Sequence, residues 1–320
     1  MMTNFPIGDE IMDNVTILYV IDAYLLNLDT LEIEYDVLND VFIRDLRNNK
    51  IEVIEGGAFT GLLELKSLSI TRNRLYLIAD GVFLPLSNLT TLSLDTNEIS
   101  NLQDIGFRGL SKLTYLYLNT NLIAKVSQKS WDGIEDLYLL SVSLNDFLDL
   151  ENYMFSELSS IKRLRLFSNK IEIIEPRAFA NLTKLSYINL SWNRLVSVSS
   201  IMFGNLPSLN RLFLRQKKFL KLLSDMRVCS INDIEANLFS NNAMLKTLNL
   251  HNSFITSVDE EAFNPLTNLK ILLMDENRIR SIEDYQFTDL ANLKSLFLRS
   301  NNIQTISSKA FHGLNNIEEM

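Results

Sequence analysis

Leucine and isoleucine recur along most of this chain in short clusters that polar stretches separate. A typical cluster has the form L-x-x-L-x-L-x-x-N, as in Leu89, Leu92, Leu94 and Asn97. Alternate residues of a strand point to opposite sides, so the L-x-L element predicts a short strand with its leucines inward. Aliphatic residues two and five positions after the Asn predict a second buried segment in each cluster.

The clusters repeat every 24 residues. The asparagines that mark them are Asn49, Asn73, Asn97, Asn121, Asn145, Asn169 and Asn193. A large aromatic follows ten positions later at Phe59, Phe83, Phe107, Trp131, Phe155, Phe179 and Phe203, and this series resumes at Phe239, Phe263, Phe287 and Phe311. No repeat can bury its own leucines and aromatic, so the repeats must stack around one continuous core. We expect the Asn amides to bond backbone groups of adjacent turns and to form a ladder along the stack.

These motifs resemble the leucine-rich repeat family, as Leu116, Leu118, Asn121, Ile123 and Trp131 illustrate. The 24-residue form is similar to the typical class of animal extracellular repeats, as in Toll-type ectodomains and insect leucine-rich immune proteins. The resemblance implies an α/β solenoid, the leucine-rich repeat horseshoe, with a concave parallel β-sheet and an irregular or short helical convex side. It also implies protein recognition in innate immunity or at a cell surface, although this fold specifies function weakly.

The N-terminal end departs from the repeat. Residues 1–40 form an acidic segment with a partial repeat or cap, because Asp36 occupies an Asn slot only 13 residues before Asn49. Arg44 falls where the first full repeat expects an inward Leu. The chain has 30 basic and 39 acidic residues, but residues 1–43 hold nine acids and no base. The remainder is therefore neutral, which argues against general binding of nucleic acid.

The solenoid over residues 41–320 comprises about eleven repeats with one further irregularity. Asn193 and Cys229, which occupy successive Asn slots, are 36 residues apart, so a 12-residue insertion is expected near 216–227. It is either an ordered loop or an error in the gene model. The chain ends in the middle of a repeat. We therefore expect a fragment, or an end that a partner or a second copy of the chain covers.

The outward strand positions, which lie six, four and two residues before each Asn slot, line the concave face. In the middle repeats these positions combine arginine with aromatic residues, a composition typical of binding hot spots. The residues of this predicted partner-binding surface are Tyr115, Tyr117, Arg163, Arg165, Phe167, Tyr187, Trp192, Arg211, Phe213 and Arg215. Its local positive charge suits a protein partner with an acidic surface. The alternative is that strands favour aromatics in any case and that the arginines merely stack on them.

Residues for catalysis or cofactor binding are scarce. One Cys and two His exclude a disulfide scaffold and leave little for a metal site. The chain contains neither a nucleophile elbow nor a glycine-rich phosphate loop, so we expect no enzyme activity and no cofactor. No apolar run reaches the length of a membrane span, and the acidic start does not resemble a secretory signal.

Four N-x-S/T sequons occur, at Asn14, Asn88, Asn181 and Asn189. Asn88 and Asn181 fall in loops, where a glycan would point to solvent. A glycan at Asn189 would instead cover the predicted binding surface on the concave face. Together with the repeat type, the sequons favour a secreted protein or the ectodomain of a membrane protein. Two alternatives stay open: a cell-adhesion or matrix structural protein, and a cytoplasmic scaffold that regulates an enzyme. Unmodified sequons would favour the cytoplasmic scaffold.

Overall fold

The computed structural model describes residues 8–12, 15–19, 27–28, 41–102, 106–195, 198–203, 206–215, 233–236 and 238–320. They fall into two compact units. The first unit comprises residues up to 147 together with 154–161, and the second comprises 148–153 together with 162–320. The predicted insertion at 216–227 and most of the acidic segment 1–40 lie outside the described residues.

The long strands of the first unit form a sheet in chain order. They are β1 (Gly8–Met12), β2 (Val15–Tyr19), β4 (Val41–Asp45), β6 (Ser67–Ser69), β7 (Thr91–Ser93), β9 (Tyr115–Tyr117) and β11 (Leu139–Ser141). β1 and β2 are antiparallel, and all later neighbours in this unit are parallel. In β6 and β7 the middle Leu is buried and the flanking polar residues lie on the other face, as the L-x-L pattern predicts.

The second unit continues the same construction with six parallel strands. They are β13 (Arg163–Arg165), β15 (Tyr187–Asn189), β16 (Arg211–Phe213), β18 (Thr247–Asn249), β20 (Ile271–Leu273) and β22 (Ser295–Phe297). β16 pairs directly with β18, with Arg211 opposite Thr247. The sheet is therefore continuous across the interval that contains the additional residues.

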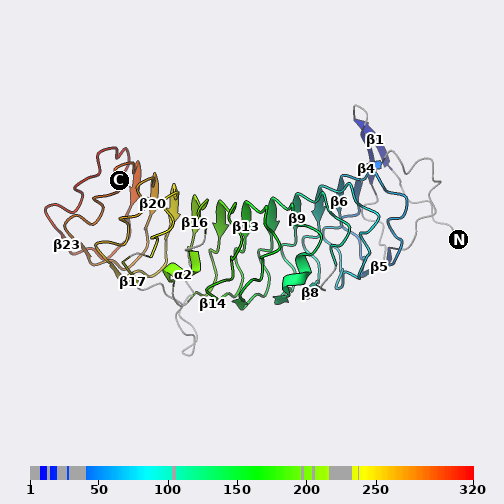
Figure 1. Cartoon of the computed structure of the whole chain (residues 1–320), viewed down its shortest axis with the longest axis horizontal. Helices are drawn as coiled ribbons and strands as arrows, with labels where there is room; N and C mark the ends of the chain where they lie inside the picture. Colours follow the sequence, from blue (N-terminus) through cyan, green and yellow to red (C-terminus); the bar gives the residue numbers. More distant parts are fainter. Residues whose placement is uncertain are drawn as a thin grey trace. The chain divides into compact units, whose positions relative to one another are not determined.

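Short two-residue strands lie on the side of each unit opposite the long strands (Figure 1). The parallel pairs are β3 (Asn27–Leu28) with β5 (Val53–Ile54), β8 (Asn101–Leu102) with β10 (Lys125–Val126), β12 (Asp149–Leu150) with β14 (Ile173–Ile174), β17 (Asp233–Ile234) with β19 (Ser257–Val258), and β21 (Ser281–Ile282) with β23 (Thr305–Ile306). Among the described residues, the helices on this side are a 3-10 turn, η1 (Gln128–Trp131), and α2 (Ser200–Phe203). The fold is thus the predicted solenoid, with a parallel sheet on one side and irregular, barely helical structure on the other.

The predicted aromatics form a buried column inside the first unit. Phe59, Phe83, Phe107, Trp131 and Phe155 follow one another with ring centroids 5.8–6.5 Å apart. All five rings are fully or almost fully buried. Because each ring packs on the ring of the next repeat, the column supplies the inter-repeat contact that a single repeat lacks.

The predicted asparagine ladder is also present. Asn73 illustrates it: its Nδ2 donates to the carbonyls of Leu46 and Ile70, each at 3.0 Å, and its Oδ1 accepts from the amide of Ile51 at 3.0 Å. Each such side chain therefore joins two repeats through otherwise unpaired backbone groups.

The residue before most ladder positions has a positive φ. This left-handed conformation occurs at Asn48, Arg72, Thr96, Thr120, Leu144, Ser168, Trp192, Asn252, Glu276 and Ser300, with φ between 51° and 60°. The turn follows each long strand and directs the side chain of the left-handed residue toward the edge of the sheet. Trp192 and Glu276 are two such residues.

Arg44 occupies an inward position, as its place in the repeat predicts. It lies opposite Leu68 of β6 and is only 2% exposed. Burial lowers the pKa of its guanidinium to about 10. Within the part of the chain that the structure describes, its Nε and Nη2 make no hydrogen bond, and its Cζ lies 5.8 Å from the ring centroid of Phe59. A charged group therefore occupies a core position of the first unit with little compensation.

Replacing this buried charge should stabilise the protein. We expect Arg44→Met to raise the free energy of unfolding by about 1–3 kcal/mol, because it removes unsatisfied donors and keeps an unbranched side chain. The desolvation penalty is fully present below the lowered pKa, so the gain should be complete at neutral pH. Urea unfolding measures it, and Arg74→Met, at a half-exposed arginine, is the control and should change little. A loss of stability in Arg44→Met would contradict this interpretation.

Candidate recognition surface

The outward positions of β13, β15 and β16 form a regular grid. Arg163, Tyr187 and Arg211 occupy one row across the three strands. The next row holds Arg165, Asn189 and Phe213, one pleat further along. Neighbouring members of a row belong to strands about 4.8 Å apart. The intervening Leu164, Ile188 and Leu212 are fully buried, so the grid rests on a packed core.

One aromatic cluster spans both rows of this grid. The Cζ of Arg163 is 5.1 Å from the ring centroid of Tyr187. The ring of Phe213 lies 5.2 Å from that of Tyr187 and is tilted by 41°. We call Arg163, Tyr187 and Phe213 the Tyr187 cluster. Its cation–π and aromatic contacts restrict the side chains before any partner arrives.

A second aromatic cluster lies at the end of the same strands. The rings of Phe167 and Trp192 are 4.9 Å apart, and the Cζ of Arg215 is 5.9 Å from the ring centroid of Trp192. Trp192 is at the left-handed turn position, with φ 60°, and its backbone N–H donates to the carbonyl of Arg215 at 2.6 Å. We call Phe167, Trp192 and Arg215 the Trp192 cluster. The turn places the indole at the sheet edge, where it meets the other two side chains.

The positive charge of this surface is not balanced locally. None of Arg163, Arg165, Arg211 and Arg215 forms an ion pair with a carboxylate among the described residues. Two of the four guanidinium groups lie against aromatic rings, whereas those of Arg165 and Arg211 make no hydrogen bond or ring contact there. The surface can therefore supply charge-assisted hydrogen bonds to an anion without first breaking an internal pair.

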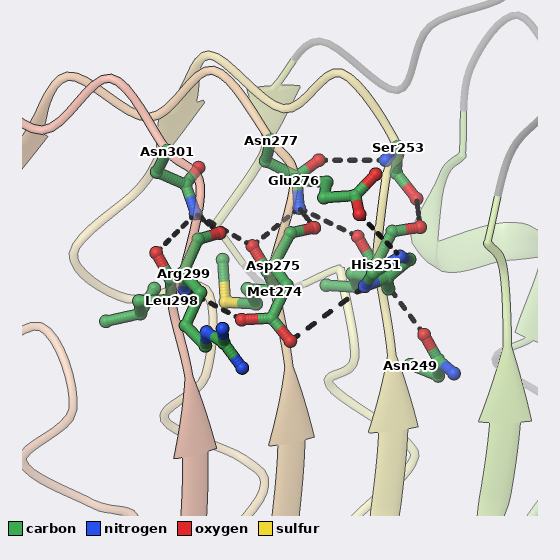
Figure 2. Close-up of polar contacts among 11 residues, drawn as sticks. Asn249, His251, Ser253, Met274, Asp275, Glu276, Asn277, Leu298, Arg299 and Asn301 are labelled. Carbon is green, nitrogen blue, oxygen red and sulfur yellow. Dashed lines mark hydrogen bonds and ion pairs between the residues drawn. The ribbon is translucent and has the colours of Figure 1, made fainter. Parts of the chain in front are cut away.

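A group of acidic side chains lies farther along the second unit, around His251 (Figure 2). The Nδ1 of His251 lies 3.9 Å from Asp275 Oδ2, and its Nε2 lies 3.8 Å from Glu276 Oε1. Asp275 Oδ1 accepts the backbone N–H of Arg299 at 2.7 Å. Glu276 reaches the imidazole because it occupies the left-handed turn position, with φ 55°. We call Asp275 and Glu276 the acidic border; the two carboxylates lie beyond the basic grid, next to His251 and Arg299.

The predicted site residues are distributed over both units. Eight of the ten lie in the second unit, in the two clusters and at Arg165 and Arg211, and we call these eight the arginine–aromatic surface. Tyr115 and Tyr117 lie on β9 of the first unit, where Tyr115 packs edge-on against Tyr138 at 5.9 Å. Sequence reasoning did not single out Glu276 as a neighbour of His251. The signal was available, since Glu276 precedes its ladder Asn as Trp192 does.

The three described sequons differ in their environment. Asn88 is exposed, but its Nδ2 donates to the carbonyl of Leu63 at 3.0 Å and its Oδ1 accepts from Lys112 at 2.7 Å. The Asn189 Oδ1 accepts the backbone N–H of Ser191 at 3.0 Å, and Asn181 is exposed with φ 68°. Among described residues the Asn181 side chain makes no hydrogen bond, so a glycan there would displace none. Asn14 lies outside the described residues.

Two negative findings apply to the described ranges. Their His, Cys, Asp and Glu side chains form no group suited to holding a metal ion. Their helices include none with the length and apolar character needed to cross a bilayer.

The repeat geometry defines a solenoid of the parallel-sheet class, with the outward grid on its sheet face. The sequence profile described as leucine rich repeat matches residues 45–99, 87–147, 135–195, 225–279 and 267–320. The chain therefore belongs to the leucine-rich repeat family. No curated protein matches its sequence closely enough to add a relative.

Solved structures share the fold at low sequence identity. The TLR13 chain of a complex with single-stranded RNA matches 95% of this chain with 23% identity and a TM-score of 0.70. A structure of the Toll–Spatzle complex of Drosophila matches 90% of this chain with 23% identity and a TM-score of 0.78. A structure of a complex of Latrophilin 3, Unc5D and FLRT2 matches 89% of this chain with 23% identity and a TM-score of 0.76. This chain spans 49% and 37% of the first two chains and 81% of the third.

Proposed function

We propose that this chain is a non-enzymatic recognition module that binds a partner protein through the arginine–aromatic surface. One observation carries the proposal: four arginines without ion pairs among the described residues are interleaved with Tyr187, Phe213, Phe167 and Trp192 on one packed face. Arginine and large aromatics dominate binding energy at protein interfaces. The two clusters hold their side chains in place, which reduces the entropy that a partner must overcome.

We further propose an extracellular setting, as a secreted protein or receptor-type ectodomain in innate immunity or cell-surface recognition. The similarity to structures in which Toll is complexed with Spatzle, and in which FLRT2 is assembled with Unc5D, supports this setting. RNA, which the TLR13 structure contains, is disfavoured as a ligand because the acidic border lies on the same face as the arginines.

The surface can be tested with two single substitutions. We expect Arg165→Ala and Phe213→Ala each to weaken partner binding at least about tenfold, corresponding to about 1.4 kcal/mol, with an unchanged melting temperature. Wild-type and variant chains would be immobilised, and retained proteins from extracellular fluid quantified by mass spectrometry before affinities are measured. Arg280→Ala removes an exposed arginine beside β21, away from the grid, and should retain everything that the wild type retains. Normal binding by both surface variants would refute the proposed surface.

A further inference from the structure

The Tyr187 and Trp192 clusters leave a polar position between them. On β13 and its continuation, Arg163, Arg165 and Phe167 occupy alternate outward positions. Arg163 belongs to the first cluster and Phe167 to the second, so Arg165 lies midway. Each step covers two residues of a strand, or about 6.6 Å. On β13 an unengaged guanidinium therefore lies between one member of each cluster, and Phe213 of the Tyr187 cluster lies in the same row, two strands away.

A second donor lies beside Arg165. Asn189 is its partner in the register between β13 and β15. The Oδ1 of Asn189 is already engaged by the backbone N–H of Ser191, whereas its Nδ2 donates no hydrogen bond to any described residue. The engaged oxygen fixes the amide, so in a chain without a glycan at Asn189 the nitrogen is available. Arg165 and Asn189 can thus donate together to one anion at a place that aromatic rings partly shield from water.

From this placement we propose a specific ligand chemistry, which rests on the function proposed above. The surface binds an extended segment of a partner protein in which one Asp or Glu has an apolar side chain two residues away on each side. The carboxylate accepts hydrogen bonds from Arg165 and Asn189. One apolar side chain packs on the Tyr187 cluster and the other on the Trp192 cluster. Alternate residues of an extended segment advance by about 6.6 Å, the same step as the outward positions of β13.

The acidic border limits how much negative charge the ligand can carry. Asp275 and Glu276 follow β20, two strands beyond β16, and both carboxylates face His251. A single carboxylate over β13 and β15 avoids them, whereas a polyanion that continued across the strands would approach them. The border therefore favours a protein segment with an isolated acid over a phosphate backbone.

Synthetic peptides test the chemistry directly. The probe is a nine-residue peptide with Leu-Ser-Glu-Ser-Leu at its centre. Two comparison peptides carry Gln in place of Glu, or the same residues in the order Leu-Glu-Ser-Ser-Leu. We expect the full chain to bind the first peptide at least about tenfold more tightly than either comparison. The Gln peptide lacks the charge-assisted pair, and the reordered peptide no longer has its Glu midway between the two leucines. Fluorescence anisotropy at two salt concentrations measures the affinities.

Substitutions in the chain identify the residues that discriminate between the Glu and Gln peptides. Arg165→Gln should remove the preference for Glu over Gln. Asn189→Asp keeps an acceptor for Ser191 but replaces the donor by a carboxylate. This carboxylate should repel the Glu of the peptide and abolish its binding, while the melting temperature of the protein is unchanged. Phe213→Ala should weaken the Glu and Gln peptides equally, because it removes an apolar contact. Arg280→Gln is the matched control and should behave as the wild type.

The outcomes separate this inference from the proposed function. Equal binding of the Glu and Gln peptides, or no binding of any peptide, overturns the inference. So does tighter binding of a single-stranded RNA oligonucleotide than of the Glu peptide. If protein capture is still lost in Arg165→Ala and Phe213→Ala, the proposed function survives and only the ligand chemistry is wrong. If capture is unaffected, both fail.

Discussion

Asn121→Ala is expected to lower the free energy of unfolding by about 3 kcal/mol or more. The Asn121 side chain is 6% exposed and lies in the middle of the ladder of the first unit. Its Nδ2 donates to the carbonyls of Leu94 at 3.0 Å and Leu118 at 3.1 Å, and its Oδ1 accepts from the amide of Ile99 at 3.0 Å. Alanine satisfies none of these buried groups, and each unpaired group costs about 1–3 kcal/mol.

Chemical unfolding with tryptophan fluorescence measures the loss, and two further variants locate its cause. Asn101→Ala changes an exposed asparagine on β8 and should alter stability by less than about 0.5 kcal/mol. Asn121→Asp retains an acceptor for Ile99 but places a carboxylate among carbonyl oxygens, so it should be at least as destabilising as alanine. A stable Asn121→Asp protein would show that the donors of the ladder are dispensable.

The periodicity of the sequence was sufficient to predict the interior. A 24-residue spacing determines which side chains lie in register on successive strands, so the Asn ladder and the aromatic column follow from it. The same spacing predicted an inward position for Arg44, and the structure has it in the core opposite Leu68. Its charge alone would have predicted a surface position. Position in the repeat outweighed residue type, because one slipped residue would turn every Leu of the strand outward.

The exposed surface was predictable only in composition. Arg163 and Arg165 are alike in the sequence, two residues apart on one strand and both half-buried. Only Arg163 lies over a ring, because Tyr187 is its neighbour in register whereas Arg165 faces Asn189. Which arginine contacts a ring thus depends on the residue that lies opposite it on the neighbouring strand. Strand alternation likewise does not predict where Glu276 and Trp192 point, since the left-handed turn directs both side chains to the sheet edge.

The interior and the surface are linked through rigidity. The outward grid keeps its spacing because the buried Leu164, Ile188 and Leu212 alternate with it in the same strands. In the binding mode proposed above, an extended partner segment with the same spacing of alternate residues as β13 would therefore meet donors and rings at fixed intervals, as preorganised binding requires. Loss of inter-repeat packing would be expected to disturb recognition even where no surface residue changes.

Trp131→Ala is expected to have the largest effect of any single substitution considered, about 3–5 kcal/mol in the free energy of unfolding. The indole is fully buried between Phe107 at 6.3 Å and Phe155 at 6.0 Å. Its Nε1 donates to the carbonyl of Met154 at 2.8 Å. Alanine therefore leaves a large cavity in the column and also an unpaired carbonyl. Calorimetry or urea unfolding measures the loss.

Trp131→Phe separates the two contributions. Phenylalanine occupies the corresponding position in the neighbouring repeats, so the column should remain continuous, and the loss should be about 1–2 kcal/mol from the missing hydrogen bond and the smaller ring. Because repeats contact mainly their neighbours, amide exchange in Trp131→Ala should accelerate most around Phe107 and Phe155. An even acceleration across all repeats would instead mean that the solenoid unfolds as one cooperative unit. A loss below about 1 kcal/mol in Trp131→Ala would show that the aromatic column does not hold the repeats together.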